Sequence, residues 1–242
     1  PATGCVSESP LSLKITKTLM ELLNSFGYTA YDEDRGVGQI RHILIKTSFH
    51  YPEALVTIVA ADENLKGIRD LAKALVAAIP EVKGVVLNIN RRKTNVILGM
   101  EEHPVYGYPR IKDRILGKDF AISSRSFFQT NPVLLDTLYE KAIEAAHLTG
   151  RERVLDAYCG TGTIGICLAD KALNVTGVEI ERSSYEDAKT NARLNNVKNI
   201  FFRNEDATEF IAQTKGNFDV VVLDPPRKGT TPQFVRAVLR MA

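Results

Sequence analysis

The feature that most constrains the fold of this chain is a regular alternation of strand and helix signals along its second half. Short runs rich in β-branched residues alternate there with segments of helical periodicity, and the links between them are short. We expect strands at Arg153–Ala157, Val175–Glu179, Ile200–Arg203 and Phe218–Leu223, and helices at Pro132–Ala146, Thr163–Asp170, Ser183–Asn195, from Ala207 and from about Thr231. This order predicts an α/β fold with a doubly wound parallel sheet, which binds ligands at the carboxyl ends of its strands.

The first half mixes helices and strands less regularly. Ser9 is placed to cap an amphipathic helix that Gly27 ends. We expect strands at Gln39–Phe49, Ala54–Ala61, Val82–Asn90 and Asn95–Leu98, and a second helix at Leu65–Ile79. We therefore predict a small α+β domain over residues 1–118, followed by a Rossmann-like domain over residues 119–242.

Composition narrows the class of protein. The 242 residues are 44% hydrophobic and 25% charged, an ordinary globular balance, and no apolar run reaches the roughly 18 residues of a membrane span. Three cysteines are too few for a disulfide framework, which favours a reducing, cytoplasmic location and no membrane. The net charge of +2 gives no global sign of nucleic-acid binding, so such a function must rest on local features.

A glycine-rich turn follows the first strand of the second half. It runs from Asp156 through Gly160 and Gly162 to Gly165 and contains Gly-x-Gly-x-x-Gly, a pattern that a plain βα turn, a dinucleotide site and a methyltransferase can all show. Asp156 lies four residues before Gly160, where a carboxylate would repel the pyrophosphate of NAD. It can instead orient the turn or a cationic amino-acid group, which favours S-adenosyl-L-methionine.

Three more carboxylates follow the later strands. Glu179 is placed to accept hydrogen bonds from both ribose hydroxyls of an adenosine cofactor. Asp206 has two interpretations of equal weight, a contact with the adenine amino group and the N-cap of the next helix. Asp224 ends a strand expected to be buried and is followed by Pro225-Pro-Arg-Lys-Gly229, an acid and a basic pair that a turn alone does not require.

A further segment, Ser126-Phe-Phe-Gln-Thr-Asn-Pro132, precedes the first helix of the second half. Its two aromatic rings and its amide can stack on a base and hydrogen-bond its edge. The alternative is structural: Asn131 as the helix N-cap with Pro132 at the first helical position. The two interpretations are compatible.

Taken together, these segments resemble the RNA uracil-C5 methyltransferases, which make 5-methyluridine in ribosomal and transfer RNA. The resemblance is closest to the branch that acts on bacterial 23S ribosomal RNA. The matching segments follow the family order along nearly the whole chain: Gly38–His42, Asn88–Gly99, Ser126–Pro132, Asp156–Gly162, Gly177–Glu179, Asn191–Asn195 and Asp224–Gly229.

The resemblance to this family implies which residues form the cofactor site. It implies that S-adenosyl-L-methionine is bound by Gln129, Tyr158, Gly160, Gly162, Glu179, Asp206 and Asp224. Phe127 would stack near the target base. Thr163 stands where some members carry Asn, which weakens any transfer of a polar contact to that position. No resident metal is expected.

The family's chemistry uses a cysteine thiolate that attacks uracil C6, and a glutamate base. By the resemblance, both lie beyond Ala242, so this chain is expected to carry no catalytic residue and to be incomplete at its C-terminus. Cys159 and Cys167 are expected to serve the cofactor turn and the helix packing instead. Cys5 is a candidate fourth ligand of an iron–sulfur cluster only if three upstream cysteines exist in the native protein.

We therefore expect an RNA (uracil-C5) methyltransferase whose partner is RNA, with 23S ribosomal RNA as the substrate. The alternatives are a transfer RNA uridine-C5 methyltransferase and a non-catalytic module that binds RNA and cofactor. A nitrogen-directed methyltransferase would carry Asn-Pro-Pro-aromatic in place of Asp224-Pro-Pro-Arg. The residues expected to contact RNA phosphates are Arg91, Arg92, Lys93, Arg227 and Lys228.

Overall fold

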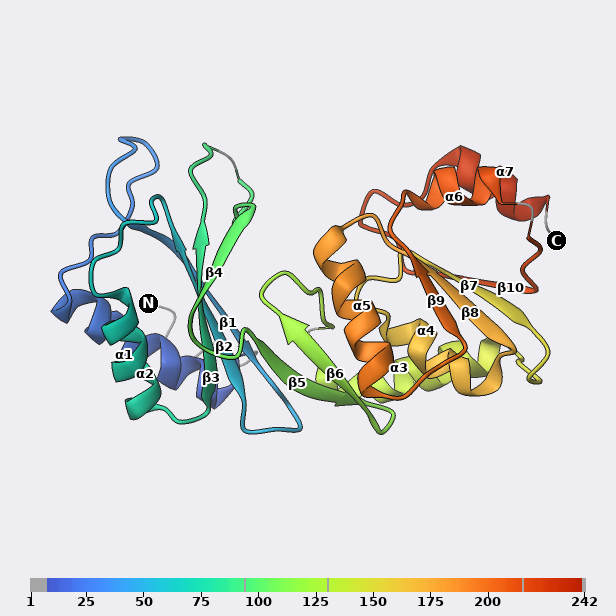
Figure 1. The fold of residues 1–242 in the computed structure, drawn as a ribbon, viewed down its shortest axis with the longest axis horizontal. Helices are drawn as coiled ribbons and strands as arrows, with labels where there is room; N and C mark the ends of the chain where they lie inside the picture. Colours follow the sequence, from blue (N-terminus) through green and yellow to red (C-terminus); the bar gives the residue numbers. More distant parts are fainter. Residues whose placement is uncertain (1–7, 94, 130, 215, 241–242) are drawn as a thin grey trace. The chain divides into compact units, whose positions relative to one another are not determined.

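A computed structural model describes residues 8–93, 95–129, 131–214 and 216–240 (Figure 1). The chain divides into two compact units, residues 1–112 and residues 113–242. The predicted domain boundary at residue 118 remains a prediction. The predicted role of Cys5 as a cluster ligand remains one too, because Cys5 lies outside the described residues. Within the described ranges, no helix is long and apolar enough to cross a membrane.

The first unit is a four-stranded mixed sheet with two helices packed on it (Figure 1). Its elements are α1 (Pro10–Ser25), β1 (Ile40–Thr47), β2 (Ala54–Ala60), α2 (Ile68–Ala78), β3 (Val82–Ile89) and β4 (Glu101–Gly107), and the strands lie in the order β1-β2-β3-β4. β2 and β3 are parallel, with α2 as their connection, and both outer pairs are antiparallel. Ser9 caps α1 by accepting from the Ser12 amide at 3.1 Å, as predicted.

The prediction of a strand at Asn95–Leu98 is wrong. Two buried asparagines of the β3 end hold this segment as a loop: Asn90 Nδ2 donates to the carbonyls of Val96 and Ile97 at 2.7 and 3.0 Å. Asn88 exchanges hydrogen bonds with the backbone of Gly99. The strand follows instead as β4, whose charged and proline-containing sequence gave no strand signal.

The second unit opens with two strands that were not predicted, β5 (Arg110–Ile115) and β6 (Lys118–Ser123), which form a two-stranded sheet. The boundary between the units falls within β5. Leu116 and Gly117 connect the strands and both have positive φ, 48° and 76°. Two positive φ values are typical of a tight hairpin turn, which leucine rarely adopts, so the sequence gave no turn signal.

A four-stranded parallel sheet forms the centre of the second unit. Its strands are β7 (Arg153–Ala157), β8 (Asn174–Val178), β9 (Ile200–Arg203) and β10 (Val220–Leu223), in the order β10-β7-β8-β9. The helices are α3 (Pro132–Ala145), α4 (Thr163–Leu168), continued by a 3-10 turn to Lys171, α5 (Arg182–Leu194), α6 (Ala207–Gln213) and α7 (Pro232–Leu239). One apolar cluster joins α3, α4 and α5 to one face of the sheet, and a second joins α6 and α7 to the other (Figure 1).

The predicted α/β, doubly wound architecture is therefore confirmed, with one correction. The strand ending at Leu223 was expected to be buried, but β10 lies at the edge of the described sheet and is half-buried, and Leu223 is 42% exposed. An unbroken apolar run does not distinguish a central strand from an edge strand, which explains the error.

Candidate functional site

The strand order places a topological switch point between β7 and β10. The chain leaves β7 for β8 on one side and returns to β10 on the other, so the crevice for a ligand opens at the carboxyl ends of these two strands. Asp156 is the fourth residue of β7, Glu179 directly follows β8 and Asp224 directly follows β10. The sheet thus brings to one edge three carboxylates that the sequence singled out.

The turn after β7 has a backbone that requires glycine. Tyr158, Gly160 and Gly162 have φ of 63°, 56° and 80°. A Cβ at Gly162 would lie 3.1 Å from the Cβ of Ala188 on α5, so the turn packs closely there. A Cβ at Gly160 would meet no atom within 4 Å. The turn is therefore fixed on its α5 side and open at Gly160, where a ligand can approach the backbone.

Asp156 is 2% exposed, and its Oδ2 accepts a hydrogen bond from the Gly165 amide at 2.8 Å. This contact fits the expectation that Asp156 orients the turn. Burial raises the pKa of Asp156 to about 7, the Gly165 hydrogen bond opposes this rise, and the charges of Asp224 and Glu179 add to it. A cationic ligand near these carboxylates would favour the ionised form of Asp156.

Glu179 already bonds to the glycine turn. Its Oε2 accepts from the Gly160 amide at 2.9 Å, and its Oε1 accepts from the Glu181 amide at 2.7 Å. The carboxylate is thereby held at the open point of the turn. Its contact with ribose hydroxyls stays a prediction.

Asp206 acts as an N-cap. Its Oδ1 accepts from the amides of Thr208 and Glu209 at 2.8 and 3.2 Å, at the start of α6. One of its two interpretations is thus confirmed, and the adenine contact stays a prediction. The neighbouring Tyr158 ring packs against Phe234 of α7, with the ring centroids 5.7 Å apart.

The aromatic segment before α3 reaches the same edge of the sheet. Gln129 Nε2 donates to Asp224 Oδ2 at 3.3 Å, which joins two of the predicted site residues. Phe127 is 67% exposed, as a stacking residue would be. Asn131 caps α3 by accepting from the Leu134 amide at 3.4 Å, with Pro132 at its first turn, so the structural interpretation is confirmed as well.

Neither described thiol is suited to nucleophilic attack. Cys159 is 8% exposed, and burial raises its pKa well above the ordinary value. Cys167 is 5% exposed in the core between α3 and the sheet, and burial raises its pKa to about 12. Because the thiolate is the nucleophile, both side chains are inert near neutral pH.

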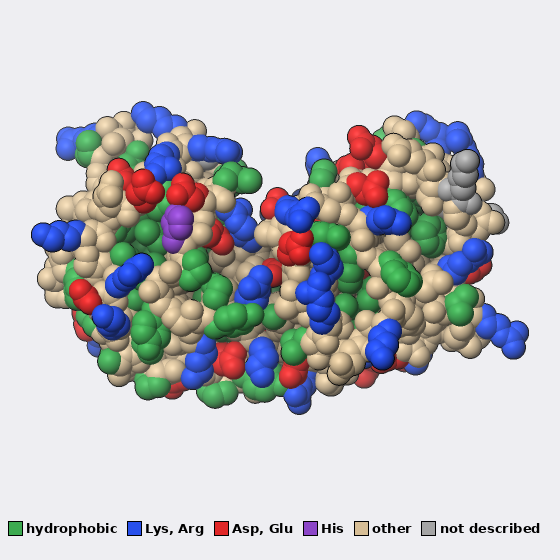
Figure 2. Space-filling model, viewed as in Figure 1, with side chains coloured by type: hydrophobic (Ala, Val, Ile, Leu, Met, Phe, Trp, Pro, Cys, Tyr) green, Lys and Arg blue, Asp and Glu red, His purple; other side chains and the backbone are tan. Residues whose placement is uncertain are grey.

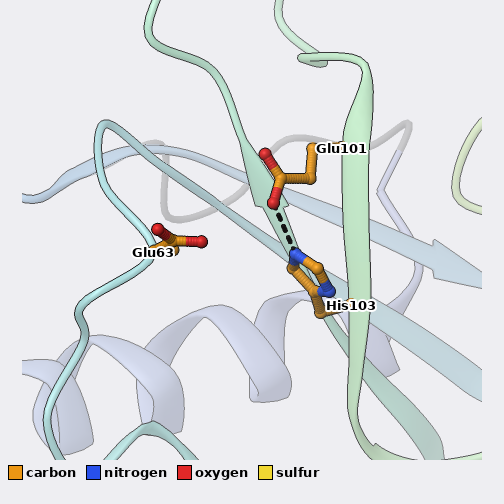
Figure 3. A group of neighbouring side chains, drawn as sticks. All are labelled: Glu63, Glu101 and His103. Atoms are coloured by element: carbon orange, nitrogen blue, oxygen red, sulfur yellow. Dashed lines mark hydrogen bonds and ion pairs between the residues drawn. The ribbon is translucent and has the colours of Figure 1, made fainter.

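The basic residues of the first unit differ in their surroundings. Arg91 contacts Glu63 at 3.6 Å and Glu101 at 3.2 Å, and Glu101 is also 2.8 Å from His103 (Figure 3). The ligand atoms of Glu63, Glu101 and His103 lie within 4.8 Å of one another, but the guanidinium of Arg91 already supplies a cation to both carboxylates.

The other predicted phosphate contacts are exposed: Arg92, Lys93, Arg227 and Lys228. Arg227 and Lys228 follow β10 directly after the Pro225-Pro226 pair, on the loop that begins with Asp224. On the face drawn in Figure 2, acidic and basic side chains are interspersed over both units. On this face, therefore, neither unit presents a uniformly basic surface (Figure 2).

Comparison with known proteins decides the nature of the second unit. Residues 148–238 match the family model described as a methyltransferase domain. A crystal structure of a Pyrococcus abyssi tRNA (uracil-54, C5)-methyltransferase in complex with S-adenosyl-L-homocysteine superposes with a TM-score of 0.79 and 27% identity, covering 98% of this chain and 57% of that one. Residues 148–238 are thus similar to a methyltransferase domain, and their fold is the Rossmann-like fold of S-adenosylmethionine-dependent methyltransferases.

Curated relatives match both units. An uncharacterized RNA methyltransferase of Clostridium tetani is 41% identical over 242 residues, 99% of this chain and 53% of that protein. An uncharacterized RNA methyltransferase of Listeria innocua is 42% identical over 224 residues, 91% of this chain and 49% of that protein. The chain thus spans about half the length of these relatives.

Sequence reasoning gave no role to the polar residues that hold the site together, although Asn191 lies in one of the matching segments. Asn191 and Asp187 of α5 are buried and hydrogen-bond to the segments that carry the site. The sequence held a signal for them: three polar residues spaced four apart, Asp187, Asn191 and Asn195, on a helix whose other positions are largely charged or small. A buried polar row of this kind has to find hydrogen-bond partners.

Proposed function

We propose that this protein binds S-adenosyl-L-methionine and methylates RNA at C5 of uridine. The observation that carries the proposal is the convergence of Asp156, Glu179 and Asp224 with an open glycine turn at the switch point of the sheet. A dinucleotide is disfavoured, because Asp156, a buried carboxylate near the end of β7, would repel pyrophosphate. A cofactor with a cationic amino-acid moiety and no phosphate fits the site.

Specific residues of this chain take roles in cofactor binding. Glu179, held at the open point of the turn, accepts hydrogen bonds from the ribose, and Asp206 lies beside the adenine at the start of α6. Gly160 and Gly162 shape the turn, and Tyr158 closes it against α7. Gln129 and Asp224, bonded to each other at 3.3 Å, face the transferred methyl group. S-adenosyl-L-methionine supplies that methyl group.

Uracil C5 becomes a nucleophile only after addition at C6. In the proposed reaction a cysteine thiolate adds to C6, the electron pair moves to C5, and C5 takes the methyl group from the sulfonium. A base then removes the C5 proton, and the thiolate leaves C6. Cys159 and Cys167 are buried with raised pKa, so we assign the thiolate to a residue outside 8–240. The glutamate base is taken from the resemblance alone.

The substrate that we favour is 23S ribosomal RNA, because the resemblance of the whole chain is closest to the branch that acts on it. A second candidate is transfer RNA. The Pyrococcus abyssi structure, whose own substrate is named as tRNA uracil-54, supports it with a TM-score of 0.79 over 98% of this chain. The cytoplasm, where both RNAs are made and modified in bacteria, is the proposed location.

Two measurements test the proposal. Calorimetry on this chain with S-adenosyl-L-homocysteine and with NAD⁺ tests the cofactor: we expect binding of the first alone, and binding of NAD⁺ alone refutes the assignment. The full-length protein is then given transcribed ribosomal RNA, transfer RNA and labelled cofactor. Methyl transfer to uracil C5 of ribosomal RNA supports the first substrate, transfer to transfer RNA supports the second, and cofactor binding without turnover on either supports the non-catalytic module.

A further inference from the structure

A row of polar side chains runs along one face of α5. Asp187 and Asn191 are spaced four residues apart on α5, so they project from successive turns on the same side of the helix, and Asn195, the C-cap residue of α5, follows after four more residues. Asp187 and Asn191 are 1% and 0% exposed. Buried polar groups of this kind are retained only when they are hydrogen-bonded, so their partners show what the row does.

Asn195 and Asn191 are hydrogen-bonded to backbone groups along one edge of β6. Asn195 accepts from the Asp119 amide at 3.0 Å and donates to the Asp119 carbonyl at 2.7 Å. Asn191 likewise accepts from the Ala121 amide at 2.7 Å and donates to the Ala121 carbonyl at 3.4 Å. Alternate residues of a strand direct their backbone groups to the same edge, so the two carboxamides take the place of a neighbouring strand.

The third member of the row extends this attachment beyond the strand. Both Ser123 Oγ and Ser126 Oγ donate to Asp187 Oδ2 at 2.6 Å. Ser126 directly precedes the segment Phe127–Gln129, and Gln129 contacts Asp224. The face of α5 therefore fixes the start of the segment to which we assign the target base.

Asn191 makes one contact that its neighbours in the row do not share. Its Nδ2 also donates to the carbonyl of Thr161, between Gly160 and Gly162, at 3.1 Å. The orientation of its carboxamide is determined, because both carbonyls need a donor and the Ala121 amide needs an acceptor. One buried side chain thus joins the cofactor turn to the strand that leads into the base-binding segment.

We propose that Asn191 is a positioning residue that sets the glycine turn and the Phe127–Gln129 segment in register, so that cofactor and target base meet in the correct geometry. The inference rests on the proposed function for the identity of the two ligands. Asn195 provides the contrast, because it holds the same strand at Asp119 and also bonds to the α5 backbone, and its recorded hydrogen bonds do not reach the turn.

The experiment compares two variants with the same chemical change, Asn191→Asp and Asn195→Asp, in this chain. Each keeps the acceptor for the β6 amide and loses the donor. At position 191 the new oxygen faces the carbonyls of Thr161 and Ala121, and at position 195 it faces the carbonyls of Asp119 and Asn191. The readouts are hydrogen exchange of the Gly162 amide, which is bonded to the Cys159 carbonyl, and affinity for S-adenosyl-L-homocysteine.

We expect Asn191→Asp to speed exchange at Gly162 and to weaken binding of S-adenosyl-L-homocysteine by about three- to tenfold, the factor for one neutral hydrogen bond. Asn195→Asp should leave both the exchange at Gly162 and the affinity unchanged, although it too should lower the thermal stability. In the full-length protein, Asn191→Asp should lower kcat more than it raises the KM for RNA, because the two ligands still bind but meet in the wrong geometry.

Equal effects of the two variants on Gly162 exchange and on affinity would overturn the inference, since the row would then only stabilise the fold. If Asn191→Asp does not fold, Asn191→Ala and Asn195→Ala carry the same comparison. Failure of the proposed function is separable from this result. Unaltered protein that does not bind S-adenosyl-L-homocysteine refutes the cofactor, whereas the exchange comparison still decides the role of Asn191.

Discussion

Glu179 has two tasks at the candidate site, and a single substitution separates them. Its carboxylate holds the amides of Gly160 and Glu181, and we propose that it also accepts from the ribose hydroxyls. Glu179→Ala should weaken S-adenosyl-L-homocysteine binding by about 1–3 kcal/mol, the range for hydrogen bonds to a charged group. Calorimetry measures this loss. Glu181→Ala is the matched control, because its carboxylate bonds to Ser183 and not to the turn; equal affinity in both variants would exclude Glu179 from the ribose.

Asp156 predicts a pH dependence of stability. Its pKa is raised from 3.8 to about 7 on folding, chiefly by burial. Between these values the folded state binds the extra proton, so the stabilising contribution is complete below pH 3.8 and is lost as pH rises through about 7. Asp156→Asn keeps an acceptor for the Gly165 amide but does not titrate. Urea unfolding at pH 5 and pH 8 should show that the unaltered chain loses more stability than the variant; parallel losses would refute the assignment.

Salt dependence of RNA binding distinguishes the basic residues. Arg91 is already paired with Glu63 and Glu101, whereas Arg92 and Lys93 are exposed. Neutralising either Arg92 or Lys93 in the full-length protein should reduce the slope of the logarithm of the RNA-binding constant against the logarithm of salt concentration. The expected reduction is roughly 0.7–0.9, which corresponds to the loss of one phosphate contact. Arg91→Ala, the control, should change the slope less. The slope is measured by titrating RNA at several salt concentrations, and no change on neutralising Arg92, Lys93, Arg227 and Lys228 together would remove them from the interface.

For individual residues, sequence reasoning succeeded where the order of strands and helices determines which residues lie close together. Asp156, Glu179 and Asp224 lie at strand ends, and parallel strands bring their carboxyl ends to one edge, so their proximity was predictable. The ion pairs of Arg91 were not predictable, because Glu63 and Glu101 reach it from other segments of the first unit. The role of Asn191 was missed for the same reason: its partners, Ala121 and Thr161, are 70 and 30 positions away in the chain.

Among the elements, α6 offers a test that separates capping from binding. Asp206 caps this helix, and we propose that it also accepts from the adenine amino group. Asp206→Ala should destabilise the chain by about 1 kcal/mol through loss of the cap, whereas Asp206→Ser should retain most of it, since serine caps nearly as well. Both variants lose the carboxylate, so both should weaken S-adenosyl-L-homocysteine binding. Chemical unfolding measures the stability of the two variants, and calorimetry measures their affinity for S-adenosyl-L-homocysteine. If Asp206→Ser binds this ligand with full affinity, Asp206 serves only as the cap.

The elements that the sequence predicted share a clear local signal. The four strands of the parallel sheet are rich in apolar and β-branched residues and alternate with helices, so their existence followed from periodicity. The hairpin of β5 and β6 was missed because its turn uses Leu116 at positive φ. β4 was missed because side chains of Asn88 and Asn90, not local propensity, decide where the preceding loop ends. In the case of β4, tertiary contacts override the local signal.

On the scale of the whole molecule, the two units carry different parts of the proposed function. The second unit contains the methyltransferase fold and all the proposed cofactor residues. The first contains the exposed Arg92 and Lys93 and is matched by the curated RNA methyltransferases together with the second. We propose that the first unit grips RNA, because it carries these exposed basic residues and accompanies the cofactor-binding unit in these relatives. Composition alone could not show this, since the net charge is only +2.

The last prediction concerns the nucleophile of the whole reaction. Cys159 and Cys167 are buried and their pKa values are raised, so neither supplies a thiolate near neutral pH. In the full-length protein, the double variant Cys159→Ser and Cys167→Ala should therefore methylate RNA at the rate of the unaltered protein.

The double variant should also form a covalent adduct with RNA that carries 5-fluorouridine. A base cannot remove fluorine as it removes the C5 proton, so the C6–sulfur bond persists. A gel that resolves protein from protein–RNA adduct under denaturing conditions measures this. The 242-residue chain should bind cofactor but form no adduct. Loss of the adduct on changing Cys159 would identify that residue as the nucleophile and would refute the proposed assignment.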